Sequence, residues 1–216
     1  MTEFEILPKL IGVSGRKHNG KDTVGNYLVE VYDYKRIAFA DKLKEACIII
    51  FGLTKEQVFD ETLKDVVDNY WGTSPRTILQ YVGTDLLRNQ LKNIIPHIDN
   101  NIWVKVVHKQ ILDELQKDPL QKFVITDVRF ENEIQFIKEM GGVNIRITRP
   151  TIENNDTHSS ENQLQKCKVD YDIINDCTLE SLYMTVDETL HDIFRSKFIP
   201  VTDLKPHPYG VLVSNL

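Results

Sequence analysis

The strongest constraint on the fold of this chain comes from residues 15–21, which read Gly-Arg-Lys-His-Asn-Gly-Lys. An apolar run, Leu10 to Ser14, precedes this segment, and a helical pattern follows it. In such a strand, loop and helix unit, successive backbone N–H groups point into one concavity, with the N-terminus of the helix behind them. The glycines provide backbone conformations that side chains disfavour, and Lys21 brings a positive charge to the terminal phosphates. The segment therefore predicts a loop that binds the polyphosphate of a nucleotide.

Asp22 departs from the general form of this motif, in which a Ser or Thr hydroxyl binds Mg²⁺; here the hydroxyl comes one place later, at Thr23. A carboxylate beside a triphosphate is unfavourable unless it faces the metal, its waters or a basic side chain. We therefore expect Asp22 to act through Mg²⁺ or to start the helix. The alternative, an ordinary strand-to-helix turn, explains fewer of these features. The residues of this segment expected to bind ATP are Gly15, Lys17, Asn19, Gly20, Lys21, Asp22 and Thr23.

The composition is that of one globular domain rather than of a nucleic-acid-binding or membrane protein. The 216 residues include 41% hydrophobic residues and carry a net charge of −6, which argues against a broad basic surface for nucleic acid. The three cysteines, Cys47, Cys167 and Cys177, lack the spacing of a zinc site and are expected to be free thiols. We find neither a targeting segment nor an apolar run of membrane-spanning length, so we expect an intracellular, cytoplasmic protein.

Short apolar runs alternate with longer helical patterns, which predicts an α/β fold with a five-stranded parallel sheet flanked by helices. The expected strands are Leu10 to Ser14, Lys35 to Phe39, Lys122 to Asp127, Val143 to Thr148 and Tyr171 to Asn175. The expected helices are Lys21 to Tyr32, Asp41 to Phe51, Lys55 to Phe59, Pro75 to Lys92, Asn101 to Gln116, Glu131 to Met140 and Leu179 to Phe198.

We interpret residues 1–216 as a single domain with two additions to its core. An insert at about residues 41–100 is expected to bind the acceptor, and a polar loop at 150–165 is expected to be a lid, with an ordinary surface loop as the alternative. The proline-containing extension 199–216 would pack along the body or join a partner subunit, so a homodimer stays open.

A second group of candidate residues follows the strand that ends at Asp127. This apolar strand leads into Asp127 and Arg129 at the edge of the sheet where the phosphate loop also lies. Asp127 can bind a Mg²⁺ water or orient the acceptor, and Arg129 can hold phosphate oxygens through its planar fork. A purely structural turn is the alternative. We favour the functional interpretation, because buried charges at a strand end are costly to leave unpaired.

Missing features narrow the class of nucleotide-binding protein. A GTPase would carry an Asn-Lys-x-Asp segment, which we do not find, and the acidic chain lacks the size and basic tracts of a helicase. A kinase of a small phosphorylated molecule becomes the leading hypothesis.

Several blocks of the sequence, in their order along the chain, resemble the deoxynucleoside monophosphate kinases of large bacteriophages and related viruses. These blocks are Gly20 to Thr23, Leu79 to Leu86, Trp103 to Lys105, Thr126 to Arg129, Arg149 to Pro150 and Asn155 to His158. The resemblance covers nearly the whole chain, and it explains Asp22 as the family's own version of the phosphate loop. It implies a fold similar to nucleoside monophosphate kinases, a P-loop NTPase fold with a lid. It also implies Mg²⁺ and transfer of the γ-phosphoryl group of ATP to a deoxynucleoside 5′-monophosphate.

The expected lid contains no arginine, so the charge of the transferred group must be stabilised from elsewhere. Our first choices are Arg16 and Arg129, which complete the expected catalytic group together with Lys21 and Asp127. The metal is expected at Thr23, Asp22 and Asp127, and Arg149 can stack on adenine.

The acceptor is expected to bind between the insert and the phosphate loop. The candidate residues are Asp41, Lys44, Arg76, Gln80, Thr84, Arg88 and Trp71. On one continuous α-helix, Arg76 and Arg88 would lie about 18 Å and about 120° apart, which would prevent both from holding one phosphate. We prefer Arg76, because it stands at a helix start where the dipole favours an anion. Lys44 has an equally good explanation as a solvated helix charge.

Two other functions remain as alternatives. The first is a related kinase that acts on another small phosphorylated acceptor, of the phosphomevalonate or dephospho-coenzyme A type. The second is a regulatory module that binds nucleotide without transfer. The presence of Lys21, Thr23, Asp127 and Arg129 argues against the second, since a module that only binds has less need of a metal-side acid and an additional arginine.

Overall fold

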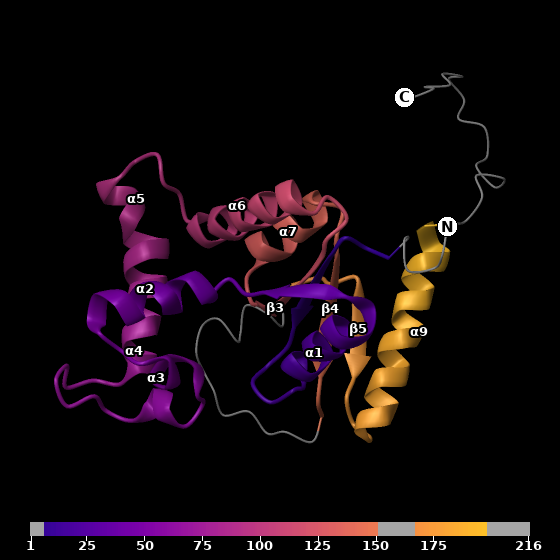
Figure 1. Ribbon diagram of the computed structural model, residues 1–216, viewed down its shortest axis with the longest axis horizontal. Helices are drawn as coiled ribbons and strands as arrows, with labels where there is room; N and C mark the ends of the chain where they lie inside the picture. The colour runs from indigo at the N-terminus through magenta and orange to yellow at the C-terminus, as the bar shows by residue number, and fades with distance from the viewer. Residues whose placement is uncertain (1–6, 151–166, 198–216) are drawn as a thin grey trace.

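The computed structural model describes residues 7–150 and 167–197. These residues contain the expected five-stranded parallel sheet, in the order β2-β3-β1-β4-β5 (Figure 1). The strands are β1 (Leu10–Ser14), β2 (Tyr34–Ile37), β3 (Lys122–Val128), β4 (Val143–Thr148) and β5 (Tyr171–Ile174). The helical elements are α1 (Lys21–Tyr32), α2 (Asp41–Phe51), α3 (Lys55–Phe59), η2 (Leu63–Asp65), α4 (Pro75–Gln80), η3 (Tyr81–Gln90), α5 (Leu91–Ile94), α6 (Ile102–Lys117), α7 (Glu131–Glu139) and α9 (Leu179–Lys197).

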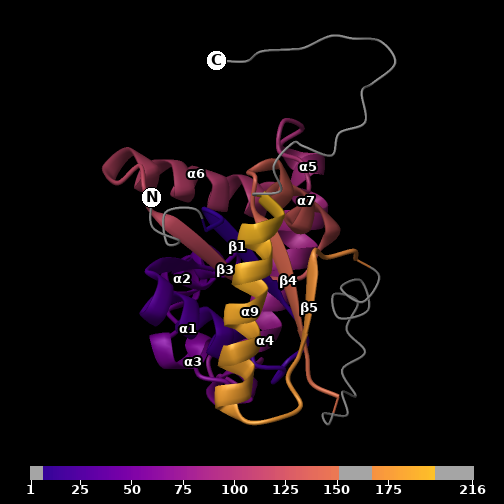
Figure 2. The ribbon, with the colours of Figure 1, turned by 90° about the vertical axis from the view of Figure 1, so that its right-hand side faces the viewer.

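Helices cover both faces of the sheet because alternate strand residues point to opposite sides. On β3, Phe123 and Ile125 pack with α6 and α7 in one hydrophobic core, whereas Val124 between them packs with α1 and α9 in the other. Figure 2 shows α9 lying across one face of the strands. Both faces of the sheet are therefore buried, which explains why its strands read as continuous apolar runs.

The second strand ends two residues earlier than expected, at Ile37 rather than Phe39. The backbone N–H groups of Phe39 and Ala40 donate to the carboxylate of Asp127, at 2.8 and 2.9 Å, instead of continuing the sheet. The apolar run therefore turns away from the sheet and leads directly into α2.

Helices α2 to α5 form the insert, which projects to one side of the strands, at the left of Figure 1. The prediction of a single α-helix from Pro75 to Lys92 is wrong in one respect. The central part of this segment, η3, is a π-helix that lies between α4 and α5. The helix starts where expected, with Ser74 accepting a hydrogen bond from the N–H of Thr77 and Pro75 in the first turn. A π-helix turns less per residue than an α-helix, so the azimuth calculated for Arg76 and Arg88 does not apply.

The lid expected at residues 150–165, Pro150 aside, and the extension 199–216 lie outside the described residues. Their roles, the single-domain interpretation and the homodimer stay predictions. No helix within residues 7–150 and 167–197 is long and apolar enough to cross a membrane.

Candidate active site

The loop between β1 and α1 has the backbone conformation that its glycines allow. Gly15 and Gly20 have φ values of 147° and 101°, and a Cβ at Gly15 would lie 2.4 Å from the carbonyl oxygen of Ile147 on β4. Lys21 crosses the loop, and its Nζ donates to the carbonyl of Arg16 at 2.8 Å. The loop is therefore closed by its own lysine and seated directly against the neighbouring strand.

Two asparagines attach this loop to the rest of the sheet. Asn19 is buried, and its Nδ2 donates to the carbonyl of Ile147 at 3.0 Å. Asn175, which follows β5, donates from its own Nδ2 to the carbonyl of Asn19 at 2.9 Å. The side chain of Asn19 therefore joins the loop to β4 and does not point into the phosphate-binding side of the loop.

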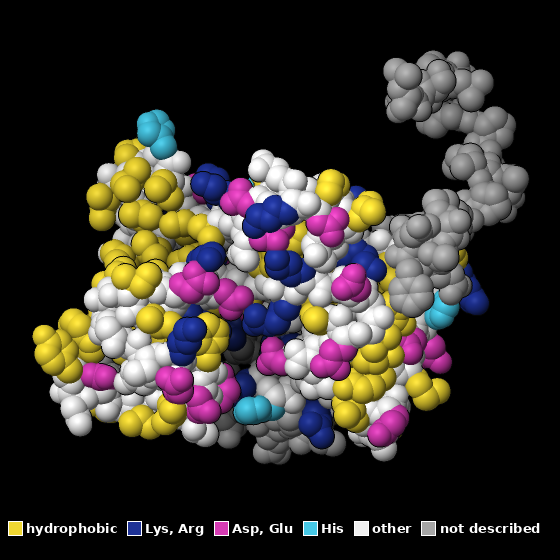
Figure 3. Space-filling model, in the orientation of Figure 1, with side chains coloured by type: hydrophobic (Ala, Val, Ile, Leu, Met, Phe, Trp, Pro, Cys, Tyr) yellow, Lys and Arg dark blue, Asp and Glu magenta, His cyan; other side chains and the backbone are white. Residues whose placement is uncertain are grey.

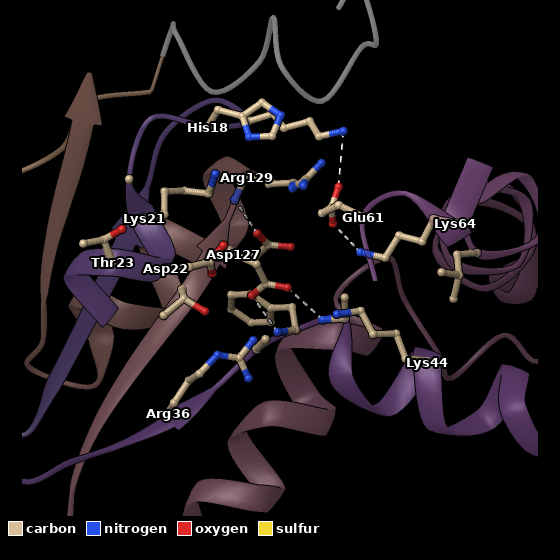
Figure 4. A pocket seen from close by; sticks show the side chains of 18 of the residues that line it. His18, Lys21, Asp22, Thr23, Arg36, Lys44, Glu61, Lys64, Asp127 and Arg129 are labelled. Atoms are coloured by element: carbon tan, nitrogen blue, oxygen red, sulfur yellow. Dashed lines mark hydrogen bonds and ion pairs between the residues drawn. The ribbon is translucent and has the colours of Figure 1, made fainter. Parts of the chain in front are cut away.

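Asp127 joins the end of β3 to the start of the insert. Its two carboxylate oxygens accept the N–H groups of Phe39 and Ala40, one each. Burial raises the pKa of Asp127 above its usual range, although these two N–H groups and the charge of Arg129 act in the opposite direction. Asp127, near the end of β3, and Arg129, just after this strand, lie beside Lys21 (Figure 4).

A further carboxylate, Glu133, lies in the first turn of α7 and was not among the residues expected at the site. It accepts from Nη2 of Arg88 at 2.8 Å and from the backbone N–H groups of Arg129 and Phe130 at 2.8 and 3.2 Å. Burial raises the pKa of Glu133 to about 7, against the opposing charge of Arg88. The sequence signal was weak, because an acid at this position usually indicates only an exposed helix cap.

Cations from the insert and from the phosphate loop meet around Glu61. Its carboxylate pairs with Lys17 at 3.2 Å, with Arg76 at 3.3 Å and with the buried Lys64. Figure 4 shows Glu61 and Lys64 joined by a dashed line. Partial burial opposes ionisation of Glu61, but the hydrogen bonds and charges of Lys64, Lys17 and Arg76 outweigh it and lower its pKa to about 2. Burial lowers the pKa of the nearby Lys44, and the charge of Lys64 acts in the same direction.

These groups line one cavity of about 840 Å³, within the roughly 300–1,000 Å³ typical of small-molecule sites. Figure 3 shows a hollow between the insert and the body of the molecule, with Lys and Arg side chains around it. Phosphate-loop and insert residues share this cavity, so it can hold two phosphorylated groups next to each other. The arrangement suits transfer of a phosphoryl group between them.

The profile of the deoxynucleotide monophosphate kinase family matches residues 53–186. The chain belongs to this family. The kinase is 44% identical over 181 residues to a protein of Acanthamoeba polyphaga mimivirus described by the same family name, covering 82% of this chain and 93% of the relative. It is 25% identical to the deoxynucleotide monophosphate kinase of Enterobacteria phage T4, covering 84% of this chain and 98% of that protein.

A solved structure, dephospho-CoA kinase from Campylobacter jejuni, resembles the kinase with a TM-score of 0.45 and 18% identity, over 88% of this chain and 98% of that chain. A likeness of this size says nothing about the acceptor. Family membership makes the protein a phosphotransferase, as the sequence blocks indicated.

Most of the residues expected at the site of this kinase line the cavity. From the donor side these are Lys17, Gly20, Lys21, Asp22, Thr23, Asp127, Arg129 and Arg149. From the acceptor side they are Lys44, Arg76, Gln80, Thr84 and Arg88. Arg76 and Arg88 thus reach one cavity, although we expected only one of them to hold the acceptor. His18, Arg36, Lys64 and Glu133 also line the cavity and were missed.

Five expected residues, Gly15, Arg16, Asn19, Asp41 and Trp71, do not line the cavity and make contacts elsewhere in the described chain. Gly15 and Asn19 lie against β4, and Arg16 contributes its carbonyl to Lys21. Asp41 accepts from Arg36 at 3.1 Å. The indole N–H of Trp71 donates to the carbonyl of Phe51 at 2.8 Å, and the two rings pack edge to face, so Trp71 is a packing residue of the insert in this structure.

The oxygen groups in the cavity fit a magnesium ion. Asp22, Thr23 and Asp127 provide hard oxygen ligands on the donor side, and each oxygen of Asp127 keeps a lone pair beyond its backbone hydrogen bond. Within the described ranges, no three His, Cys, Asp or Glu residues cluster as a metal site. This sparse set suits Mg²⁺, which keeps several waters and binds mainly through substrate phosphates and one or two carboxylates.

Proposed function

We propose that this kinase transfers the γ-phosphoryl group of ATP to a deoxynucleoside 5′-monophosphate, giving the diphosphate and ADP. The observation that supports this most is the shared cavity, which is lined by phosphate-loop residues on one side and by the cationic insert on the other. Family membership supports the reaction class. The proposal adds which residues hold each substrate.

On the donor side, the phosphate loop binds the triphosphate through its backbone N–H groups, and Lys21 binds its terminal phosphates. Bound Mg²⁺, held by Asp22, Thr23 or Asp127 and by waters, would neutralise charge on the phosphates. Arg149 stacks on the adenine, and His18 and Lys17 also line the cavity.

On the acceptor side, Arg76 and Arg88 bind the monophosphate, while Gln80 and Thr84 present amide and hydroxyl groups to the nucleoside. An oxygen of the acceptor phosphate attacks the γ-phosphorus, the bond from that phosphorus to the bridging oxygen breaks, and ADP leaves. A general base is unnecessary because the acceptor phosphate is already an anion. Arg129 provides a planar fork to the charge spread over the transferred oxygens.

The direct test is ADP release from ATP and Mg²⁺ with dTMP, dGMP, dCMP, dAMP and their ribose counterparts, with EDTA as a control. We expect release with at least one deoxynucleotide and loss of release with EDTA. ATP binding without release for any member of the panel would contradict the proposal and favour another acceptor or a regulatory role.

Replacing Arg129 by lysine is expected to lower kcat by roughly tenfold or more, because lysine keeps the charge but loses the bidentate fork. The measurement is steady-state kinetics with both substrates. Arg195→Lys, on the exposed end of α9, is the matched control and should change nothing. A wild-type kcat in Arg129→Lys would assign Arg129 a structural role.

Replacing Glu61 by glutamine is expected to lower the KM for the deoxynucleotide by roughly two- to fivefold, because it removes the anion that pairs with Lys17 and one of the two that pair with Arg76. Arg76 keeps its two hydrogen bonds to Asp65, at 2.6 and 3.2 Å, so the expected gain is small. Glu45→Gln is the control, since Glu45 forms an exposed pair with Lys42. A higher KM in Glu61→Gln would mean that Glu61 orients these cations rather than competing for them.

A further inference from the structure

Glu133 is more deeply buried than a helix cap needs to be. Its side chain is 2% exposed, although it stands in the first turn of α7, where acidic side chains usually face solvent. A neutral glutamine can also accept the capping N–H groups. Burying a charge is unfavourable unless it is paired, so the pairing of this carboxylate needs its own explanation.

The partner of Glu133 is Arg88, 45 residues earlier in the chain, on the π-helix η3. The Arg88 side chain is 12% exposed, and its guanidinium lies 3.9 Å from the centre of the Phe130 ring. The guanidinium is therefore fixed along one edge by Glu133 and across one face by Phe130. Glu133 accepts from one of its five N–H groups, which leaves donors for an anion in the cavity that Arg88 lines.

The same carboxylate also holds the loop that follows β3. Its second oxygen accepts the backbone N–H groups of Arg129 and Phe130, at 2.8 and 3.2 Å. One buried side chain therefore joins the helix that carries Arg88 to the loop that carries Arg129. The two arginines come from different elements, and the carboxylate fixes the guanidinium of Arg88 relative to the backbone of Arg129.

We propose that Glu133 is a positioning residue that orients Arg88 toward the phosphate of the acceptor nucleotide and holds it in register with Arg129. This inference rests on the proposed function, because it takes the acceptor to be a deoxynucleoside monophosphate. Glu133 does not touch the substrate and acts through Arg88. Replacement by glutamine, which can still accept the N–H groups of Arg129 and Phe130, therefore affects binding of the acceptor and leaves binding of ATP unchanged.

The test compares Glu133→Gln with the wild type in steady-state kinetics and in calorimetric binding of the deoxynucleotide. The matched control is Glu131→Gln, which removes an exposed charge from the same helix turn without touching the cavity. We expect Glu133→Gln to raise the KM and the Kd for the deoxynucleotide by roughly ten- to a hundredfold, with the KM for ATP within twofold of wild type. Glu131→Gln should match the wild type.

A double-mutant cycle separates positioning from a merely structural role. If Glu133 acts through Arg88, the combined Glu133→Gln and Arg88→Ala variant should bind the deoxynucleotide no worse than Arg88→Ala alone. Additive losses, equal increases in KM for both substrates, or wild-type behaviour would overturn the proposal. Should Glu133→Gln not fold, Glu133→Asp keeps the charge on a shorter side chain and is judged by the same criteria.

The outcomes also distinguish this proposal from the function on which it rests. If the wild type binds deoxynucleotides but transfers no phosphoryl group, the proposed function fails, and the Kd values still decide the role of Glu133. If the wild type transfers normally and Glu133→Gln behaves like Glu131→Gln, the positioning role fails alone.

Discussion

Replacing Lys21 by alanine is expected to lower kcat by at least ten- to a hundredfold while the protein stays folded. In the proposed donor site, Lys21 gives a charge-assisted contact to the terminal phosphates, and the loss of such a contact is worth about 1.5–3 kcal/mol. The lysine is only partly buried, and it donates to the carbonyl of Arg16 in the same loop, which can bind water instead. The expected effect is therefore on turnover rather than on the free energy of unfolding.

The measurement is kcat and KM for ATP, together with the urea midpoint of unfolding as a check of the fold. Lys42→Ala is the matched control, because Lys42 is an exposed helix lysine that pairs with Glu45 at 2.6 Å and does not line the cavity. Turnover near the wild-type level in a folded Lys21→Ala protein would refute the proposed donor site.

Replacing Gly15 by alanine is expected to have the largest effect on stability and to impair ATP binding as well. Its φ of 147° disfavours any side chain, and its Cβ would lie 2.4 Å from the carbonyl oxygen of Ile147, which is backbone and cannot rotate away. We expect the free energy of unfolding to fall by about 2–5 kcal/mol. The KM for ATP should rise at least tenfold, because β1 and its loop must move away from β4.

Gly141→Ala separates the two causes of this effect. Gly141 also has a positive φ, 73°, but its Cβ would meet nothing within 4 Å. Alanine there should cost only about 1–2 kcal/mol, as measured by urea unfolding, and should leave ATP binding unchanged. Equal losses in the two variants would mean that the contact with β4 relaxes easily.

The parts of the fold that are determined by residues adjacent in the sequence could be predicted from the sequence. The phosphate loop, β1 and α1 lie where expected, because the motif, the apolar run and the helical pattern adjoin one another. The end of β2 could not be predicted, since it depends on Asp127, which is 88 residues from Phe39. The π-helix was missed because it differs from an α-helix in its i→i+5 hydrogen bonds, which the apolar spacing used to predict helices does not report.

The same distinction applies to the candidate site. Lys21, Thr23, Asp127 and Arg129 carry local signals, and each lines the cavity. The position of Glu133 at the site is evident only from its hydrogen bond with Arg88. That bond forms only when the insert packs against α7, so the sequence alone did not indicate it. For a similar reason Trp71 could not be separated from a base-stacking residue, because its indole N–H partner, Phe51, ends α2, 20 residues earlier in the chain.

The π-helix η3 gives this site a way to change during evolution without disturbing the sheet. A π-turn holds about one residue more than an α-turn, so a one-residue deletion within Tyr81–Gln90 can be absorbed by conversion of a π-turn to an α-turn. Helices α4 and α5 would then keep their places, while Thr84 and Arg88 would face new directions. Changes of length in this one segment, and not only substitutions, therefore offer a route to kinases with altered acceptor preference.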